Sequence, residues 1–282
     1  MRCHRAILLF VLAALVVTSP ALAQGSKYIQ SGVDVFQTAT NAPTGADFST
    51  DPIPAGFFCP GSDPFKGTLK LLGLPLVTSP PGILGGADTI VERLQGVDLS
   101  LGYGEVPIVV RAMNLYSPDY IGIYCPGQGD TRWRVDVCLC ECQETTKIQM
   151  KLGGECDTCG FFTGELAINV CLTFTNLETG EVRGPISHAV NLGIKEMPWC
   201  MQPGAGGLEV KEPFKVDSDC DGRPDLVLPG TTNFHPGWTC DVTGGGGGGN
   251  CWQDFAHLTS CHEGPAPDHQ HCINPVCGKE RQ

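Results

Sequence analysis

The sequence predicts an all-β protein: an antiparallel β-sandwich followed by an irregular C-terminal region rich in disulfides and glycine. Residues 28–203 read as short apolar and β-branched runs separated by Gly, Pro, Asn and Asp, and helical periodicity is almost absent. The composition changes near residue 204, where glycine runs and a cluster of cysteines and histidines begin. We therefore expect a β-sandwich domain over residues 24–203 and a Cys/His/Gly-rich tail over residues 204–282.

Residues 1–23 have the composition of a secretory signal peptide. Basic residues precede an apolar run at 6–17, and residues 21–23 form a small-x-small cleavage signal. We expect a mature chain that starts at Gln24 and is secreted or periplasmic. No later apolar run is long enough to cross a bilayer, so no membrane span is predicted.

Eight strands are expected in the β-sandwich domain, each from a short run of apolar and β-branched side chains. They are residues 33–37, 67–72, 89–94, 108–115, 133–139, 148–152, 166–174 and 186–192. Residues 176–181 supply turn-forming side chains, with Gly180 suited to a positive φ, so the last two strands are expected to form a hairpin. Segments 57–64 and 78–82, rich in Pro and Gly, are expected to be surface loops.

The chain is acidic, with a formal net charge of -12. This charge argues against nucleic acid and anionic membranes as partners, because both repel a negative surface. Acidity of this kind is typical either of a soluble surface or of a protein that binds multivalent cations.

The chain contains 16 cysteines, and the expected signal peptide removes Cys3 and leaves an odd number. Export places them in an oxidising compartment, so disulfides are favoured over a zinc or redox site. The odd thiol stays free, binds a metal, or joins a second chain in a covalent dimer. Side chains on an extended strand point alternately to opposite faces, so three of the thiols lie on the same side. Each is expected to pair with a cysteine of a neighbouring strand or loop. These three are Cys138, Cys140 and Cys142, and the candidate partners are Cys125, Cys156, Cys159 and Cys171.

The aspartate loop, residues 217–225, reads Asp-Ser-Asp-Cys-Asp-Gly-Arg-Pro-Asp. Calcium needs six to eight oxygens, and side chains two residues apart converge when the backbone wraps round an ion. The predicted ligands are the side chains of Asp217, Asp219, Asp221 and Asp225 and the carbonyl oxygen of Arg223. The sequence therefore predicts a Ca²⁺ site here; the alternative is an Asp-rich surface turn.

This loop resembles the calcium-binding loops of thrombospondin type 3 repeats and related EF-hand-like loops of secreted bacterial proteins. The resemblance covers about nine to twelve residues, and Gly222 matches the position of the sharp turn. It departs at the twelfth position, where Leu228 replaces a bidentate carboxylate. The expected dissociation constant is therefore about 10⁻⁴ to 10⁻³ M unless a distant residue such as Glu212 or Asp241 completes the shell.

The C-terminal tail offers a second kind of metal site. A six-glycine spacer, residues 244–249, precedes a segment in which histidines alternate with cysteines. Imidazoles two residues apart can share copper or zinc, although surface histidines between disulfides explain the same pattern. The four histidines are His257, His262, His269 and His271.

No catalytic motif is recognisable in the sequence, so a role without enzymatic activity is favoured over an enzymatic one. The leading interpretation is an exported calcium-binding protein with a structural or adhesive role and an extracellular ligand or surface partner of unknown identity. The alternatives are a secreted hydrolase with a structural calcium ion and a transition-metal-handling protein that uses the tail histidines. The chain as a whole also resembles exported bacterial proteins with a β-rich body and a cysteine-rich C-terminal region.

Overall fold

The computed structural model describes residues 27–38, 44–140, 143–153, 156–202, 208–241 and 250–253, and this part of the chain contains strands and no helix. The all-β prediction is therefore confirmed. Nothing in the described residues is a helix long and apolar enough to cross a membrane. The strands are β1 (Tyr28–Ile29), β2 (Gly32–Phe36), β3 (Thr44–Asp47), β4 (Thr68–Gly73), β5 (Thr78–Ser79), β6 (Thr89–Arg93), β7 (Val97–Asp98), β8 (Tyr103–Tyr116), β9 (Ile121–Cys125), β10 (Gly129–Leu139), β11 (Thr146–Gly153), β12 (Cys156–Asn176), β13 (Val182–Cys200), β14 (Phe214–Val216), β15 (Leu226–Leu228), β16 (His235–Pro236), β17 (Trp238–Asp241) and β18 (Asn250–Gln253).

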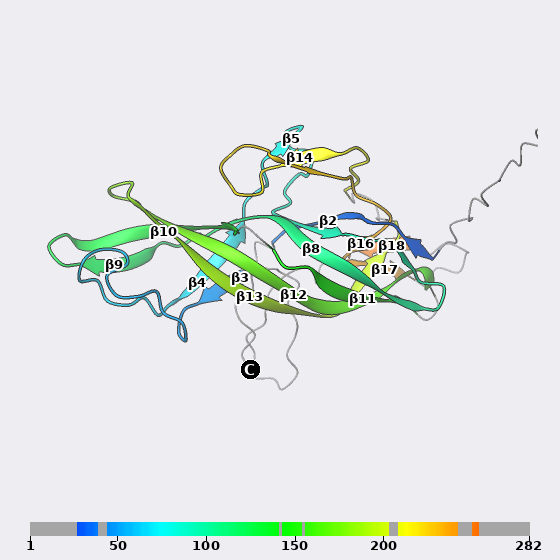
Figure 1. Ribbon diagram of the computed structural model, residues 1–282, viewed down its shortest axis with the longest axis horizontal. Helices are drawn as coiled ribbons and strands as arrows, with labels where there is room; N and C mark the ends of the chain where they lie inside the picture. The colour runs from blue at the N-terminus through cyan, green and yellow to red at the C-terminus, as the bar shows by residue number, and fades with distance from the viewer. Residues whose placement is uncertain are drawn as a thin grey trace, which may run out of the picture.

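All eight predicted strands are present, as β2, β4, β6, β8 and β10 to β13, and the last two form the predicted antiparallel hairpin. The turn between β12 and β13 has Gly180 at φ 72°, as its sequence predicts. Strands β8, β12 and β13 extend well beyond their predicted ends, and β12 and β13 run along most of the length of the molecule (Figure 1). In these three strands the apolar run marks only part of the strand.

Strand β10 shows how side-chain alternation builds the main sheet. Its odd-numbered residues from Thr131 to Leu139 are buried, and the residues between them face outwards. Trp133 and Val137 therefore enter the core, whereas Cys138 faces out. The order of pairing across this sheet is β16-β13-β12-β10-β8-β4-β3, and β11 also lies between β12 and β8, paired with other stretches of these two strands than β10. The pairs between named strands are antiparallel.

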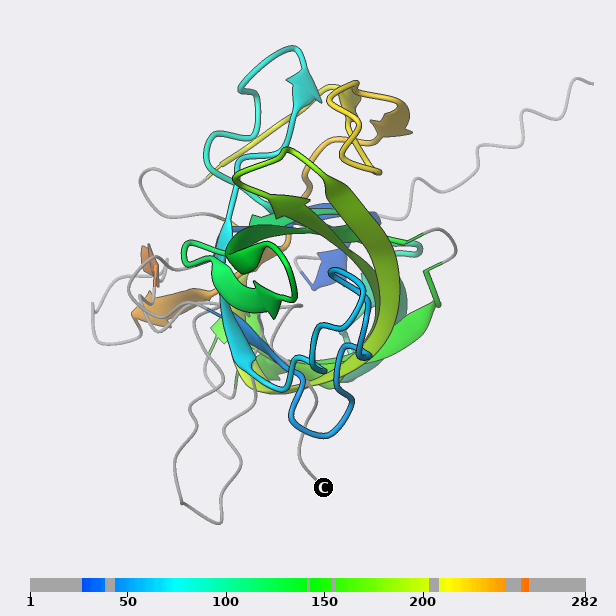
Figure 2. The same cartoon turned by 90° about the vertical axis from the view of Figure 1, so that its left-hand side faces the viewer.

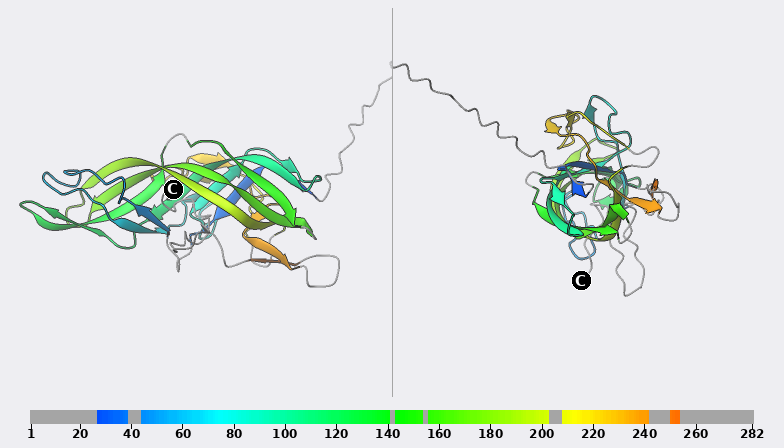
Figure 3. Two further views of the ribbon diagram at one scale, coloured as in Figure 1. Left: turned by 90° about the horizontal axis from the view of Figure 1, so that it is seen from below. Right: turned by 90° about the vertical axis from the view of Figure 1, so that its right-hand side faces the viewer.

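The main sheet curls around its own apolar face, as the end-on views show (Figures 2 and 3). The inner core lies inside the curl and contains Trp133, Trp199 and most of the buried aliphatic side chains. The loop before β4 contributes Phe58, which is fully buried with its ring 5.3 Å from those of Trp133 and Phe174. Segment 57–64 is therefore a loop, as predicted, but the expectation that it lies only on the surface is wrong. Its aromatic side chains fill one end of the inner core.

A small sheet of β15, β14 and β5 packs on the outside of the main sheet, next to β2 and β8 (Figure 1). An outer core separates the two layers. It joins Val33, Ile90 and Ala112 of the main sheet to Phe214 and Leu228 of the small sheet. The predicted β-sandwich thus consists of a curled main sheet and a small second layer. The predicted loop 78–82 begins with β5, one strand of that layer.

The residues after the predicted boundary at 204 are part of this architecture. Phe214 and Leu228 belong to the outer core, Phe234 belongs to the inner core, and β16 pairs with β13. The change in composition near residue 204 therefore does not coincide with a change in packing over residues 208–236. The division of the chain into two domains stays a prediction.

Three disulfides connect segments distant in sequence: Cys59–Cys125, Cys138–Cys220 and Cys140–Cys171. The pairing of Cys140 with Cys171 is among those predicted. Cys125 and Cys138 pair with cysteines that the sequence did not suggest, because their partners lie 66 and 82 residues away. Cys159 is also disulfide-bonded.

The remaining predicted disulfide partners fall outside the description. Cys142 lies outside the described residues, and the side chain of Cys156 is not described. A covalent dimer through the odd cysteine stays a prediction.

Candidate metal centre

The aspartate loop connects the two strands of the β14–β15 hairpin. Phe214 pairs with Leu228 and Val216 pairs with Leu226, and the Asp225 amide closes the loop by donating to the Val216 carbonyl at 3.1 Å. Leu228 is 2% exposed in the outer core. The twelfth position thus carries leucine where calcium loops carry a carboxylate because it is committed to a strand and to apolar packing.

Short-range hydrogen bonds shape the loop. The Gly222 amide donates to Asp217 Oδ2 at 2.8 Å, the Asp221 amide to Asp219 Oδ1 at 3.2 Å, and the Arg223 amide to Asp221 Oδ1 at 2.7 Å. Such bonds from an aspartate to a nearby amide favour turns over strands. Gly222 has the positive φ, 87°, that its place after the third aspartate predicts.

Three carboxylates of the loop gather at one point. Asp217, Asp219 and Asp225 each present an oxygen, and these oxygens lie within 4.8 Å of one another. Calcium binds oxygens at about 2.3 to 2.6 Å, so two ligands on opposite sides of one ion are about 5 Å apart. The spacing of the three oxygens is therefore compatible with a single shared cation whose remaining positions are open to water or carbonyl oxygens.

Asp217 is the most informative member of this group. It is 4% exposed, and its Oδ1 is buried without a hydrogen-bond partner. Burial raises the pKa of this carboxyl, and the neighbouring Asp219 raises it further, whereas the Gly222 amide opposes the shift. An ionised carboxylate that is buried beside a like charge costs free energy unless a cation or donor satisfies it.

Asp225 has the opposite environment. Its Oδ1 accepts from the Ser218 amide at 3.0 Å, and its Oδ2 accepts from the Ser218 hydroxyl at 3.0 Å. The backbone bond from Ser218 is the largest influence and lowers the pKa of Asp225. This exposed carboxylate therefore stays ionised at neutral pH, next to the buried Asp217.

The structure does not gather all five predicted ligands. Asp221 lies outside the group of three, and its Oδ1 is bonded to the Arg223 amide. The Arg223 carbonyl stays a predicted ligand. Glu212 is not part of the group, and the side chain of Asp241 is not described.

Sequence reasoning missed the tether on the aspartate loop. Cys220, between Asp219 and Asp221, is bonded to Cys138 on the outer face of β10, with the two Cα atoms 6.2 Å apart. Cys220 has φ 61°, a left-handed conformation that a side chain disfavours. A cysteine inside an aspartate loop was the available signal, but a separation of 82 residues concealed its partner.

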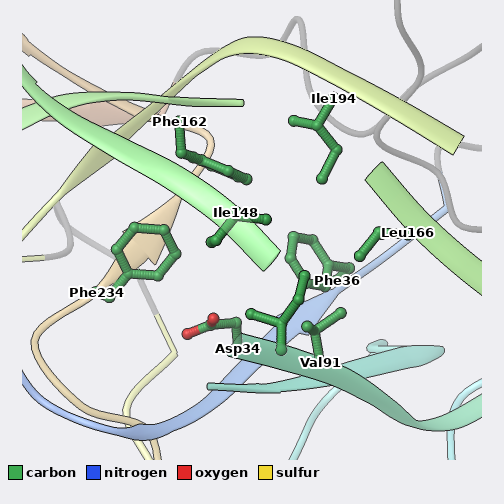
Figure 4. A pocket seen from close by; sticks show the side chains of 9 residues that line it. Asp34, Phe36, Val91, Ile148, Phe162, Leu166, Ile194 and Phe234 are labelled. Carbon is green, nitrogen blue, oxygen red and sulfur yellow. The ribbon is translucent and has the colours of Figure 1, made fainter. Parts of the chain in front are cut away.

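The inner core contains a cavity, where the hydrolase alternative would require paired carboxylates (Figure 4). Its lining is almost entirely apolar, and its volume, about 20 Å³, is room for about one water. The only carboxylate on the wall is Asp34, whose oxygens bond to Arg93 Nε at 2.9 Å and Nη2 at 3.0 Å. The lining residues are Asp34, Phe36, Val91, Ile108, Ile148, Phe162, Leu166, Ile194 and Phe234.

A second buried carboxylate, Asp88, does not line this cavity. Burial raises its pKa to about 6, and it accepts bonds from the Thr38 amide and the Thr89 hydroxyl. The two interior carboxylates with raised pKa values are thus held separately. Within the described residues, the two buried carboxylates therefore do not share one cavity.

The predicted transition-metal site cannot be placed in the fold. His257, His262, His269 and His271 all lie outside the described residues. The metal-handling alternative stays a prediction.

Comparison with known proteins adds no family assignment: no protein-family model, no curated protein and no solved structure matches the chain. The aspartate loop is therefore interpreted from its own geometry.

Proposed function

We propose that this protein is an exported calcium-binding protein in which Asp217, Asp219 and Asp225 hold one Ca²⁺ ion. The observation that carries the proposal is the buried Asp217 Oδ1, which has no hydrogen-bond partner and lies in a group of three carboxylate oxygens. A divalent cation supplies the missing partner. It also neutralises the mutual repulsion that raises the pKa of Asp217.

Calcium suits this donor set better than a transition metal. All three side-chain ligands are carboxylates, which suit hard cations, and no histidine or free thiolate belongs to the group. Three protein ligands without a twelfth-position carboxylate favour the weak end of the affinity range, a dissociation constant of about 10⁻⁴ to 10⁻³ M. Binding of this strength suits an environment where calcium is constantly present.

The bound ion has a structural role in this proposal. The loop joins two strands of the small sheet, which covers the outer core, and a disulfide ties the same loop to β10. Calcium orders the loop that closes this hairpin, so its binding free energy adds to the stability of the folded layer. Disulfides and the apparent signal peptide support an extracytoplasmic location, where a structural or adhesive role is expected.

The test is calcium titration by isothermal calorimetry on protein freed of metal with a chelator. The wild type is expected to bind one ion with a dissociation constant of about 10⁻⁴ to 10⁻³ M. At 5 mM calcium, that affinity raises the free energy of unfolding by about 1 to 2 kcal/mol. Asp217→Asn is expected to abolish both effects, since it removes the buried charge while keeping an oxygen for the Gly222 amide.

The matched control is Asp221→Asn in the same loop. Asp221 lies outside the group, and asparagine can still accept from the Arg223 amide, so calcium affinity is expected to change little. Absence of calcium binding by the wild type would overturn the proposal. Equal losses in the two variants would overturn the assignment of the three ligands.

A further inference from the structure

A surface groove on the main sheet carries an inference that does not depend on calcium. The groove has a volume of about 380 Å³ and crosses the outer face of β8, β11 and β12. It is lined by Glu105, Thr146, Lys147, Gln149, Thr163, Gly164, Glu165 and Ala167. Gly164 and Ala167 carry little or no side chain, so the longer polar side chains around them form its walls.

The groove presents hydrogen-bonding groups that are free to bind a ligand. Within the described residues, Thr163 and Glu165 make no side-chain hydrogen bond. Glu105 accepts only long contacts, 3.3 Å from Gln149 Nε2 and 3.5 Å from Lys147 Nζ. Such exposed contacts contribute little and exchange readily for bonds to a ligand. The groove therefore offers both donors and acceptors.

Exposed aromatic side chains lie beside the groove. Tyr103 and Phe161 are 65% and 46% exposed, and each pairs in register with Lys151 of β11. All three therefore lie on the outer face, in the row next to Glu105 and Gln149. Adjacent rows on one face are about 7 Å apart, and strands two apart are separated by about 9.5 Å. One ligand can thus contact a ring and the polar wall together.

We propose that this groove binds a neutral polysaccharide. Hydroxyl groups of a sugar both donate and accept hydrogen bonds, which suits a wall that contains carboxylate, amide, ammonium and hydroxyl groups. The C–H face of a sugar ring packs on the electron-rich face of an aromatic ring. The lining carries two glutamates, Glu105 and Glu165, and one lysine, Lys147, with Lys151 in the adjacent row, so no strong net charge selects an ionic ligand.

Other occupants fit this surface less well. A peptide cannot add as a strand, because β11 is already paired with β8 on one side and β12 on the other. Nucleic acid is disfavoured by the two carboxylates in the groove lining and by the net charge of -12. A protein partner usually requires a continuous apolar centre, whereas Lys151 separates the two rings here.

Affinity electrophoresis tests the proposal with gels containing hydroxyethylcellulose, dextran, galactomannan or arabinoxylan. At least one of these neutral polymers is expected to retard the wild type. Tyr103→Ala and Gln149→Ala are each expected to weaken the interaction about tenfold, the effect of losing one stacking or hydrogen-bonding contact. A pectate gel is expected to give no retardation because both partners are acidic.

Tyr124→Ala is the matched control, because Tyr124 is also 65% exposed but lies on β9, away from the groove. It is expected to leave retardation unchanged. The proposal is overturned if no neutral polymer retards the wild type, or if Tyr103→Ala and Tyr124→Ala weaken retardation equally. Retardation is expected to persist in a chelator, so failure of the calcium proposal and failure of this one are distinguishable.

Discussion

Two buried aspartates, Asp34 and Asp217, have contrasting surroundings. Their exposed fractions are similar, 3% and 4%, and burial is the largest influence on each carboxyl and raises its pKa. Asp34 has both oxygens bonded to Arg93, whose guanidinium carbon also lies 4.8 Å from the centre of the Phe234 ring. Asp217 has one oxygen bonded to an amide and the other without a partner, beside two more carboxylates.

The contrast shows what separates a structural carboxylate from a candidate binding site. At Asp34 the protein itself supplies the cation, which is the guanidinium group of Arg93. Arg93 donates to Asp34, to the Thr232 hydroxyl at 2.7 Å and to the Gln30 carbonyl, so this pair ties the chain near residue 232 to β2. At Asp217 the described residues supply further negative charge and the backbone amides of Gly222 and Cys220, and no cation. In the proposed calcium site the cation comes from solution, so occupancy would depend on the calcium concentration of the surroundings.

The largest effect is expected from removing the internal cation with Arg93→Met. This change leaves Asp34 buried without its partner, and the free energy of unfolding should fall by about 3 to 5 kcal/mol. Urea unfolding followed by tryptophan fluorescence measures the loss. Adding Asp34→Leu should recover much of it, because a buried pair can be replaced by apolar side chains at little cost. If the double variant is no more stable than Arg93→Met, the uncompensated charge is not the cause.

Asp88 is a third buried aspartate, with surroundings different from those of Asp34 and Asp217. Its hydrogen bonds come from the neutral Thr38 and Thr89, and no cation among the described residues is bonded to it. Its folded-state pKa of about 6 lies above the ordinary 3.8, so the folded chain holds this proton more tightly than the unfolded chain does. The contribution to stability is therefore present below pH 3.8 and is lost as the pH rises through about 6. Relative to Asp88→Asn, the wild type should lose about 2 to 2.5 kcal/mol of unfolding free energy between pH 4 and pH 7.

The comparison with Asp88→Asn is needed because His235 acts in the opposite direction. Burial lowers its pKa from 6.5 to about 4, so its contribution is present above pH 6.5 and is lost as the pH falls towards 4. The pH profile of the wild type alone contains both effects. The His235 contribution is the same in both proteins and cancels in the difference, and equal pH profiles for the two would contradict the prediction for Asp88.

The sequence predicted the strands and the aspartate loop because these depend on neighbouring residues. The hairpin turn at Gly180 and the turn at Gly222 follow from local conformational preferences. It could not predict which aspartates meet or which one is buried. Asp217 is buried where the small sheet packs on the main sheet, and Leu228 belongs to that interface instead of to the group of carboxylates. The partner of Cys220 depends on the same packing of segments far apart in the chain.

The smallest effect is expected from releasing the aspartate loop from β10 with Cys138→Ser/Cys220→Ser. The disulfide holds the chain between Asp219 and Asp221 in one conformation, with Cys220 at φ 61°, so the three carboxylates are positioned before calcium arrives. Without the tether, the loop must be ordered on binding, and calorimetry should show calcium affinity about tenfold weaker. Removing Cys140–Cys171, which lies outside the loop, is the matched control and should leave affinity within twofold of wild type, about 0.4 kcal/mol. If the two double variants bind calcium equally well, the tether does not preorganise the site, and the short hydrogen bonds within residues 217–225 are sufficient to shape it.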